Sequence, residues 1–532
     1  MSTQLTRRLA ETDRGQRPAG GPLGAVGQWW GRHGVLLAVL ATLGTHLLYV
    51  SRWLGADEGG FTMVAHFWRD PGAYLYGPLW VDRPPGLIGV FAVADSLGPF
   101  GPRLVVTAVA GLAVLTAADA ATLLAGRRAG TWAAWAAFAF YCSALLEAQM
   151  LNGELVASTA VLLAMDATLR ADRVASTRAA VWRLGLAAGA AAAAAALMKQ
   201  SFVDGIAFGV VLLGLRMVRG RRDRPGSHLE ASALAAFLTG TSLTLVAVAT
   251  WAAAQGKLDD LVYAVGGFRF DAARVLASWS PAAPIHRLQM LAVLVLVTGL
   301  GLLLLVSLAS SWPFLRHPSP TTLAFAAAAA VEVVGIVAGG SYWAHYLIAL
   351  VPVTVLTAGV IGVSSDRWTA RWARRRGSPG TGIRGLVVAA VVVTVVTTPV
   401  AVAAGHRESA AATVGRWVGA SARAGDSITV LYTHANAAQA SGLPPAYPYA
   451  WSLPLRTLDP HLDLLVKTLE GQRAPTWVVQ WDPLHYWGLD PHDRLEATLA
   501  SHYREVGEVC GVPVLLQRGV DRRLAPVPGC SG

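Results

Sequence analysis

Long apolar segments separated by short polar stretches fill most of the chain between residues 34 and 404. A helix needs about 20 apolar residues to cross a hydrocarbon core roughly 30 Å thick. The composition agrees with this pattern, because 54% of the 532 residues are hydrophobic and only 14% are charged. Soluble globular proteins carry about 25% charged residues. The sequence therefore predicts a polytopic α-helical membrane protein.

The apolar runs predict about eleven transmembrane helices in residues 34–404. Two of them, at 131–149 and 184–198, are short and rich in alanine, so one or two spans either way are possible. We expect the first segment to be retained rather than cleaved as a signal, because a long basic tail precedes it and no small-x-small site follows. The predicted spans are 34–52, 101–125, 131–149, 153–170, 184–198, 201–218, 229–254, 287–309, 321–339, 343–363 and 384–404.

Arginines gather in three stretches that each border an apolar segment. The positive-inside rule places such clusters in the cytoplasm, so the tail (1–33) is expected inside and residues 405–532 outside the plasma membrane. A nucleic-acid surface is the alternative, but these stretches lack interleaved aromatic residues, and we expect no nucleic-acid partner. The clusters are Arg7, Arg8, Arg14, Arg17 and Arg32; Arg216, Arg219, Arg221, Arg222 and Arg224; and Arg367, Arg371, Arg374, Arg375 and Arg376.

Residues 405–532 have a different composition and predict a small extracytoplasmic α/β domain. Short apolar runs at 428–432, 476–481 and 512–517 indicate strands, and 459–471 and 491–504 indicate helices. The domain shows no catalytic motif, so an acceptor-side or lid role and a purely structural role both stay open. Cys510 and Cys530 lie here, where an oxidising compartment would permit a disulfide, but two cysteines do not establish one.

An acidic pair, Asp57 and Glu58, follows the first predicted span and opens the polar outer loop at 55–100. Ionisable groups at a membrane edge are costly and often mark a functional site. A carboxylate at a water-accessible face can act as a general base toward an acceptor hydroxyl or amine. The alternative is a solvated loop acid without a catalytic role.

The second candidate is Asp82-Arg83 followed by Pro84-Pro85-Gly86, just before the chain turns apolar again. Two prolines stiffen the backbone and restrict the residue before them. Arg83 would then be fixed where a guanidinium can bind a phosphate through two hydrogen bonds. An arginine that reaches from the interface to water is the alternative.

Other polar residues interrupt apolar segments at the same predicted face. Each has a simpler alternative role: Glu154 as an acid favoured by a helix N-terminus, Lys199 as a chain break with its amine in water, and His345 and Tyr346 as interfacial or structural residues. Since the topology gathers all of them with the Asp57 loop and the C-terminal domain, we predict one site. Its residues are Asp57, Glu58, Asp82, Arg83, Glu154, Lys199, His345 and Tyr346.

These motifs together resemble the GT-C superfamily of membrane glycosyltransferases, which use polyprenyl-phosphate sugars. The pattern is an acidic pair in the first outer loop, acid-base-Pro-Pro, an Asn-x-Glu turn at Asn152, Lys-Gln at Lys199, and His-Tyr before a proline-bearing span. The similar branches are the protein O-mannosyltransferases and the lipid A aminoarabinose transferases, with actinobacterial members. Gly59-Gly60 after the acidic pair, Arg in place of Lys at position 83, and Gly86 after the prolines depart from the usual pattern.

The resemblance implies an inverting transfer of sugar from a polyprenyl phosphate. Asp57 would be the general base with Glu58 beside it, and Arg83, with Lys199 or His345, would stabilise the departing phosphate. The remaining candidates, Asp82, Glu154 and Tyr346, would help to bind the substrate. The acceptor could be a glycan, a lipid or a protein, and membrane lipids surround the spans. No cofactor is required, and a divalent metal stays open.

Two other functional classes compete with this enzyme. A lipid-sugar flippase or transporter would need polar residues near the middle of the bilayer, whereas these cluster at one face. A non-catalytic cell-envelope assembly protein would have no need for Asp57, Arg83 and Lys199. The chain has no P-loop, G-x-S-x-G or H-E-x-x-H motif, so ATP-driven transport, serine hydrolysis and zinc proteolysis lack motif support.

Overall fold

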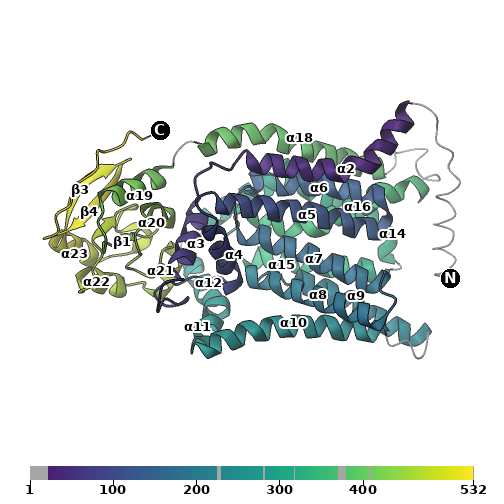
Figure 1. Cartoon of the computed structure of the whole chain (residues 1–532), viewed down its shortest axis with the longest axis horizontal. Coiled ribbons are helices and arrows are strands. Elements are labelled where there is room, and N and C mark those ends of the chain that lie inside the picture. Colours follow the sequence, from purple (N-terminus) through teal and green to yellow (C-terminus); the bar gives the residue numbers. More distant parts are fainter. Residues whose placement is uncertain are drawn as a thin grey trace.

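The computed structural model of the protein describes residues 22–223, 229–278, 282–316, 318–368, 379–406 and 409–530. Long helices lie side by side in a bundle, and a small α/β domain lies at one end of the bundle (Figure 1). Short helices α3 (Ala56–Phe67), α4 (Pro85–Ser96) and α12 (Phe268–Ser278) lie between the two parts. The mostly helical chain with a small C-terminal sheet agrees with the prediction from the sequence.

Each predicted span is helical over most of its length. In the described ranges, six helices are long and apolar enough to cross a membrane, or up to seven if a pair bent by 104° counts as one span. The figure of about eleven therefore stays a prediction. The bundle helices are α2 (Pro22–Leu47), α5 (Gly101–Ala125), α6 (Arg127–Tyr141), α7 (Gly153–Arg173), α8 (Arg178–Met198), α9 (Asp204–Asp223), α10 (Leu229–Ala254), α13 (Ala282–Val297), α14 (Leu300–Arg316), α15 (Pro320–Ala338), α16 (Val351–Trp368) and α18 (Pro379–His406).

Two predicted spans are interrupted within their predicted length. The helix expected at 131–149 ends at Tyr141, because the backbone becomes extended at Ser143 (ψ 114°), and Glu147 further along has a left-handed backbone with φ 56°. The helix expected at 287–309 is broken at Gly299, where φ is 75°. A right-handed helix cannot continue through an extended or left-handed residue, so the prediction of continuous helices was wrong at both places. Sequence hydropathy does not report backbone handedness.

Small residues allow the bundle helices to approach closely. A side chain added at Gly185 or Gly189 of α8 would meet α10 at Ala236 or at the backbone of Phe237, and one added at Gly240 of α10 would meet the backbone of α8. Membrane helices pack through such small residues because lipid supplies no hydrophobic drive for their association. The alanine-rich stretch that made the span at 184–198 uncertain is therefore a packing surface.

Most of the arginines that set the predicted topology lie outside the described residues, or in parts whose side chains are not described. These are the N-terminal arginines up to Arg32, the group from Arg221 to Arg224, and the group from Arg367 to Arg376. Arg216 and Arg219 are described: Arg216 pairs with Asp172, and Arg219 donates a hydrogen bond to the carbonyl of Pro318. The cytoplasmic side of the molecule stays a prediction.

The C-terminal domain contains a four-stranded sheet in the order β1-β2-β4-β3. Strands β1 (Ile428–Val430) and β2 (Trp477–Val479) are parallel, whereas β4 (Val512–Gln517) is antiparallel to both β2 and β3 (Tyr503–Val509). The domain also contains five helices: α19 (Ala410–Ser421), α20 (Ala435–Ser441), α21 (Ser452–Leu458), α22 (Asp463–Glu470) and α23 (Arg494–His502).

Strand β3 was missed by the sequence analysis, which extended a helix to residue 504. The structure ends α23 at His502 and pairs β3 with β4 in a hairpin whose turn is Cys510-Gly511. Both turn residues have positive φ, 54° and 76°, as a tight hairpin turn requires. The strand owes its stability to this pairing rather than to its own sequence.

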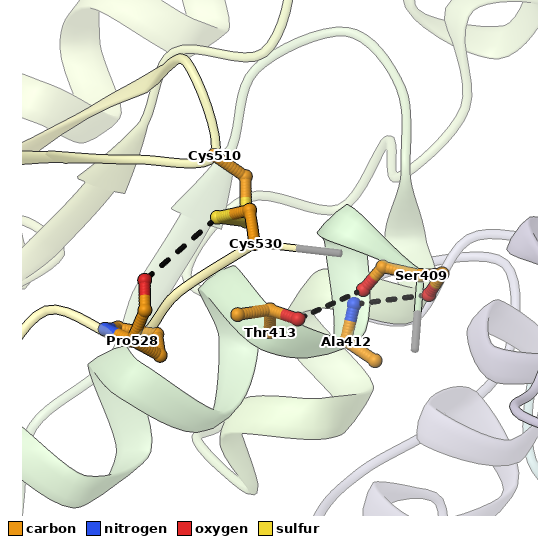
Figure 2. The surroundings of a disulfide bond; sticks show 6 residues. All are labelled: Ser409, Ala412, Thr413, Cys510, Pro528 and Cys530. Atoms are coloured by element: carbon orange, nitrogen blue, oxygen red, sulfur yellow. Dashed lines mark hydrogen bonds between the residues drawn. A yellow bond between two sulfur atoms is a disulfide. The ribbon is translucent and has the colours of Figure 1, made fainter. Parts of the chain in front are cut away.

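Cys510 and Cys530 form a disulfide bond, which the sequence left open. Figure 2 shows the bond beside the start of α19, where the Ser409 hydroxyl accepts a hydrogen bond from the Ala412 N–H at 3.2 Å. The bond ties the C-terminal tail to the β3–β4 turn. The tail is also held by Trp417, whose indole N–H donates to the Ala525 carbonyl at 2.9 Å.

Removing this disulfide should lower the stability of the C-terminal domain. The bond closes a loop with a sequence separation of 20 residues, and loop-closure entropy for such a loop contributes about 3 kcal/mol. We expect a Cys510→Ser, Cys530→Ser protein to melt at lower temperature, as measured by scanning fluorimetry of the full chain in detergent. Reductant should lower the melting temperature of the wild type but not of the variant; equal melting of the two proteins would contradict the expectation.

Candidate active site

Asp57 lies in the first turn of α3, at the end of the bundle that faces the C-terminal domain. Its Oδ1 accepts a hydrogen bond of 2.9 Å from the indole N–H of Trp451. The side chain is accessible to solvent, but the protein packed around it removes part of its hydration, which raises the pKa of this carboxyl. The charges of Arg83 and His345 oppose that rise. Asp57 is thus a carboxylate at an opening, with cationic groups near it.

Glu58 points away from Asp57 into the protein. Its carboxylate forms an ion pair with Arg103 through both oxygens, with Arg103 Nη2 at 2.8 Å from Oε2, and each side chain is 2% exposed. It also accepts hydrogen bonds from the backbone N–H groups of Gly55 at 3.2 Å and Leu151 at 2.7 Å. Glu58 therefore joins α3 to α5 and to the start of α7, and its predicted part in catalysis stays a prediction.

Asp82 and Arg83 lie on a backbone that the two prolines fix. Pro84 precedes α4 and Pro85 is its first residue, where a proline fits a helix without losing a hydrogen bond. The Tyr76 hydroxyl donates to the Arg83 carbonyl at 3.0 Å. The Gln200 amide, one residue after Lys199, donates to the Asp82 carbonyl at 3.2 Å. The motif is therefore held on both sides.

The Asp82 carboxylate is shared by two guanidinium groups. Arg83 Nη1 and Arg269 Nη2, the latter from α12, each lie 2.7 Å from Asp82 Oδ2. Burial by itself raises the pKa of Asp82, but the two arginines outweigh it and hold the pKa below its ordinary value. With two positive charges and one negative charge, this group carries one net positive charge next to Asp57.

A second charged group lines the same end of the bundle. Lys199 forms an ion pair with Glu154, and its ammonium lies 3.8 Å from the centre of the Tyr346 ring. The His345 ring lies between two acids, with Nδ1 at 2.5 Å from Glu147 Oε2 and Nε2 at 3.5 Å from Glu154 Oε1. The Asn152-x-Glu154 turn brings these groups together, since Asn152 caps α7 and donates to the Glu147 carbonyl at 3.2 Å.

The two groups interact with each other electrostatically. Burial by itself lowers the pKa of Arg83, but Asp82 and the more distant Tyr346, Asp57 and Glu154 together raise it. Seven of the eight predicted site residues therefore form one cluster around Arg83 and Asp57, and Glu58 lies behind it. The segments that carry these residues lie together in the structure, as the predicted topology requires, while their role as a site stays a prediction.

Four residues without an assigned role in the sequence analysis also belong to this region: Arg103, Glu147, Arg269 and Trp451. Arg269 lies at the start of α12 and Glu147 in the turn before α7, and the predicted topology places both segments on the same face as Asp57, so a signal for them existed. Arg103 begins an apolar helix and Trp451 lies about 400 residues beyond Asp57. The sequence around these two residues does not indicate their roles, because only folding brings Arg103 to Glu58 and Trp451 to Asp57.

Possible metal ligands lie elsewhere. In the part of the chain that the structure describes, one group of three side chains has ligand atoms close enough together for a metal ion: His485, Asp493 and Glu496 of the C-terminal domain. All three are exposed, and none is a predicted site residue. The cationic side chains near Asp57 are the groups available there to neutralise an anion.

Two solved structures resemble the whole chain. ArnT from Cupriavidus metallidurans, bound to undecaprenyl phosphate, is 15% identical, with a TM-score of 0.58 over 94% of this chain and 99% of that one. The oligosaccharyltransferase of Archaeoglobus fulgidus, tethered to an acceptor peptide, is 12% identical, with a TM-score of 0.52 over 93% and 74%. Both belong to the GT-C superfamily. This chain has the GT-C fold.

The GT-C fold confirms the fold class that the loop motifs predicted, a mostly helical chain with a small C-terminal sheet. No family model and no curated protein sequence matches the chain, so this likeness is carried by structure rather than by sequence. In this GT-C fold the short helices α3, α4 and α12 cover the end of the bundle that carries the charged cluster. The cluster lies where the helix bundle meets the C-terminal domain.

Proposed function

We propose that this protein is a glycosyltransferase that moves a sugar, with inversion, from a polyprenyl-phosphate donor to an acceptor outside the plasma membrane. The observation that carries the proposal is the Asp57 carboxylate, accessible and adjacent to a net positive group built on Arg83. The GT-C fold supports it, as does the undecaprenyl phosphate bound to the similar ArnT structure. The acceptor is a glycan, a lipid or a protein.

Asp57 is the proposed general base. Its carboxylate takes the proton of an acceptor hydroxyl or amine while the acceptor atom bonds to the anomeric carbon of the sugar. The bond from that carbon to the phosphate oxygen breaks, its electron pair stays on the phosphate, and the polyprenyl phosphate departs from the opposite face. A base whose pKa is raised toward the working pH is better suited to this proton transfer.

The donor phosphate is assigned to Arg83 and Arg269. The two guanidinium groups share a single carboxylate on Asp82, so they keep one positive charge for a phosphate. Guanidinium groups suit this role because they bind phosphate through paired hydrogen bonds. Charge that develops on the leaving phosphate is stabilised by donors already in place.

Lys199 and His345 contribute to the same site, but both side chains already form ion pairs with neighbouring carboxylates. Lys199 is paired with Glu154, and His345 lies between Glu147 and Glu154. Either cation must exchange a carboxylate for the phosphate if it is to bind the donor directly. We assign these residues, with Tyr346, to the wall of the donor site, with Arg83 as the principal phosphate contact.

Arg83→Ala should weaken donor binding. A hydrogen bond to a charged group contributes about 1.5–3 kcal/mol, which corresponds to roughly a tenfold to hundredfold loss of affinity. Asp82 keeps Arg269 as its partner, so the substitution leaves no unpaired carboxylate. We expect this loss in equilibrium binding of undecaprenyl phosphate to the purified protein. Arg473→Ala, at an exposed position of the C-terminal domain, is the control; equal affinities would contradict the assignment.

The proposed function is tested by comparing the lipid and glycan fractions of cells by mass spectrometry. Three strains are compared: a deletion strain, the same strain carrying the wild-type gene, and the same strain carrying the Asp57→Asn variant. We expect a glycosylated product to disappear in the deletion, to return with the wild type and to stay absent with the variant. Full restoration by Asp57→Asn, or no missing product in the deletion, would contradict the proposal.

A further inference from the structure

The C-terminal domain packs directly on the helix that carries Asp57. The Asn436 amide of α20 donates to the Leu54 carbonyl, just before α3, at 3.1 Å. A side chain added at Gly59 would meet the backbone of Asn436, and one added at Gly60 would meet Trp451 and Ala435. Gly59 and Gly60 are therefore the surface on which the domain rests, which gives a physical reason for the glycine pair that follows Asp57-Glu58.

Trp451 is held at this contact by both its ring and its N–H group. The ring packs against Phe61 of α3, with centroids 5.2 Å apart, and lies over Gly60. The indole N–H donates to Asp57 Oδ1 at 2.9 Å. No described residue donates a hydrogen bond to the other oxygen, Oδ2. One oxygen of the proposed base is thus fixed from the C-terminal domain, while the other stays available to an acceptor.

We infer that Trp451 is a positioning residue for Asp57, so that the C-terminal domain completes the active site. This inference rests on the proposed function. A solvent-accessible carboxylate in the first turn of a helix can occupy several rotamers, and a hydrogen bond from a packed indole selects one of them. Catalysis depends steeply on such placement, because a base must lie within hydrogen-bonding distance of the proton that it removes.

The hydrogen bond also affects the basicity of Asp57. A donor to a carboxylate favours its charged form and lowers the pKa, here against the rise that burial causes. Loss of the indole N–H should therefore raise the pKa of Asp57 further. The acid side of the pH–rate profile should then move to higher pH, which a residue that only supports the fold would not cause.

The test is Trp451→Phe in the full-length protein, assayed with undecaprenyl-phosphate-linked mannose and arabinose and with a membrane acceptor fraction. The aromatic ring stays but the N–H is lost. We expect kcat to fall roughly tenfold or more, as for the loss of one charge-assisted hydrogen bond. The fall in rate on the acid side of the pH–rate profile should move to higher pH, and KM for the donor should stay the same.

Trp417→Phe is the matched control. It makes the same change in the same domain and loses a hydrogen bond of the same 2.9 Å length, but to the Ala525 carbonyl rather than to Asp57. Its kcat and pH profile should match the wild type. If Trp451→Phe also matches the wild type while Asp57→Asn is inactive, the inference is overturned and the proposed function stands. If the deletion strain lacks no glycosylated product and the wild type transfers no sugar from either donor, the proposed function fails and the inference fails with it.

A second variant tests the contact between the C-terminal domain and the glycine pair of α3. Gly60→Ala places a methyl group against the Trp451 ring and Ala435, so the ring or α3 must shift, and this disturbs the placement of the indole N–H against Asp57. We expect it to reproduce the lower kcat and the shifted pH profile of Trp451→Phe. Gly89→Ala in α4 is the control, because no atom lies within 4 Å of the added group. Wild-type kinetics for Gly60→Ala would count against the inference.

Discussion

Asp57→Asn is expected to slow sugar transfer by about 10²- to 10⁴-fold, the usual contribution of a general base. Asparagine has nearly the same shape and can still accept the Trp451 hydrogen bond through its amide oxygen, but it cannot take up the acceptor proton. Binding of undecaprenyl phosphate should change by less than about twofold, because the proposed phosphate contacts are on Arg83. The measurement is transfer of radiolabelled sugar by the purified protein, with binding measured in parallel.

The pH dependence gives an independent check on this assignment. The base works only when it is deprotonated, and burial raises its pKa above the ordinary aspartate value of 3.8. The wild-type rate should therefore fall as the pH drops through that raised pKa, and the residual activity of Asp57→Asn should lack this fall. Asp95→Asn, at the outer end of α4 where the acid pairs with Arg69 and His66, is the control and should behave as wild type. An active Asp57→Asn protein would contradict the assignment.

Glu58→Ala is expected to destabilise the protein by about 3–5 kcal/mol, the usual cost of breaking a buried ion pair from one side. The substitution leaves the Arg103 guanidinium buried without its carboxylate, and the backbone N–H groups of Gly55 and Leu151 lose their acceptor. The melting temperature of the purified protein, measured by scanning fluorimetry, should fall by several degrees. Arg103→Ala should give a similar loss, and the double variant should lose less than the sum.

The neighbouring acid is the matched control for this experiment. Asp57 is exposed, and no cation among the described residues forms an ion pair with it, so Asp57→Ala should leave the melting temperature nearly unchanged while transfer is lost. Substitutions of the two adjacent acids should therefore have different effects: loss of Asp57 should remove activity, and loss of Glu58 should lower stability. A Glu58→Ala protein with wild-type melting and no transfer would show that Glu58 is catalytic and that its structural assignment here is incorrect.

Much of the fold followed from the sequence because apolar helices of membrane length are a strong local signal. The signal was weakest where a single residue changes the backbone direction, as at Glu147 and Gly299, since hydropathy does not depend on handedness. Strand β3 was missed for a related reason: its partner β4 stabilises it, and the pairing depends on the Cys510-Gly511 turn rather than on a run of strand-forming residues.

The sequence predicted those residues of the candidate site that place a charge inside or beside an apolar segment, where a charge is energetically costly. Asp57, Arg83, Glu154 and Lys199 stood out because each interrupts or borders an apolar segment, and the predicted topology placed them on one face. Their contacts were not predictable. Arg269 shares Asp82 with Arg83 only because α12 folds over the end of the bundle. Sequence spacing alone gives no distance between an outer loop and a helix almost 190 residues further along.

The sequence by itself determined a helical membrane protein with charged residues gathered at one face and a separate C-terminal domain. Those properties follow from hydrophobicity, which acts locally along the chain. Only the tertiary structure decided that Glu58 is bound to Arg103 while Asp57 is accessible, and that Trp451 contacts Asp57. Two adjacent acids on a helix carry the same charged group but point in different directions, so their environments depend on what the rest of the chain packs around them.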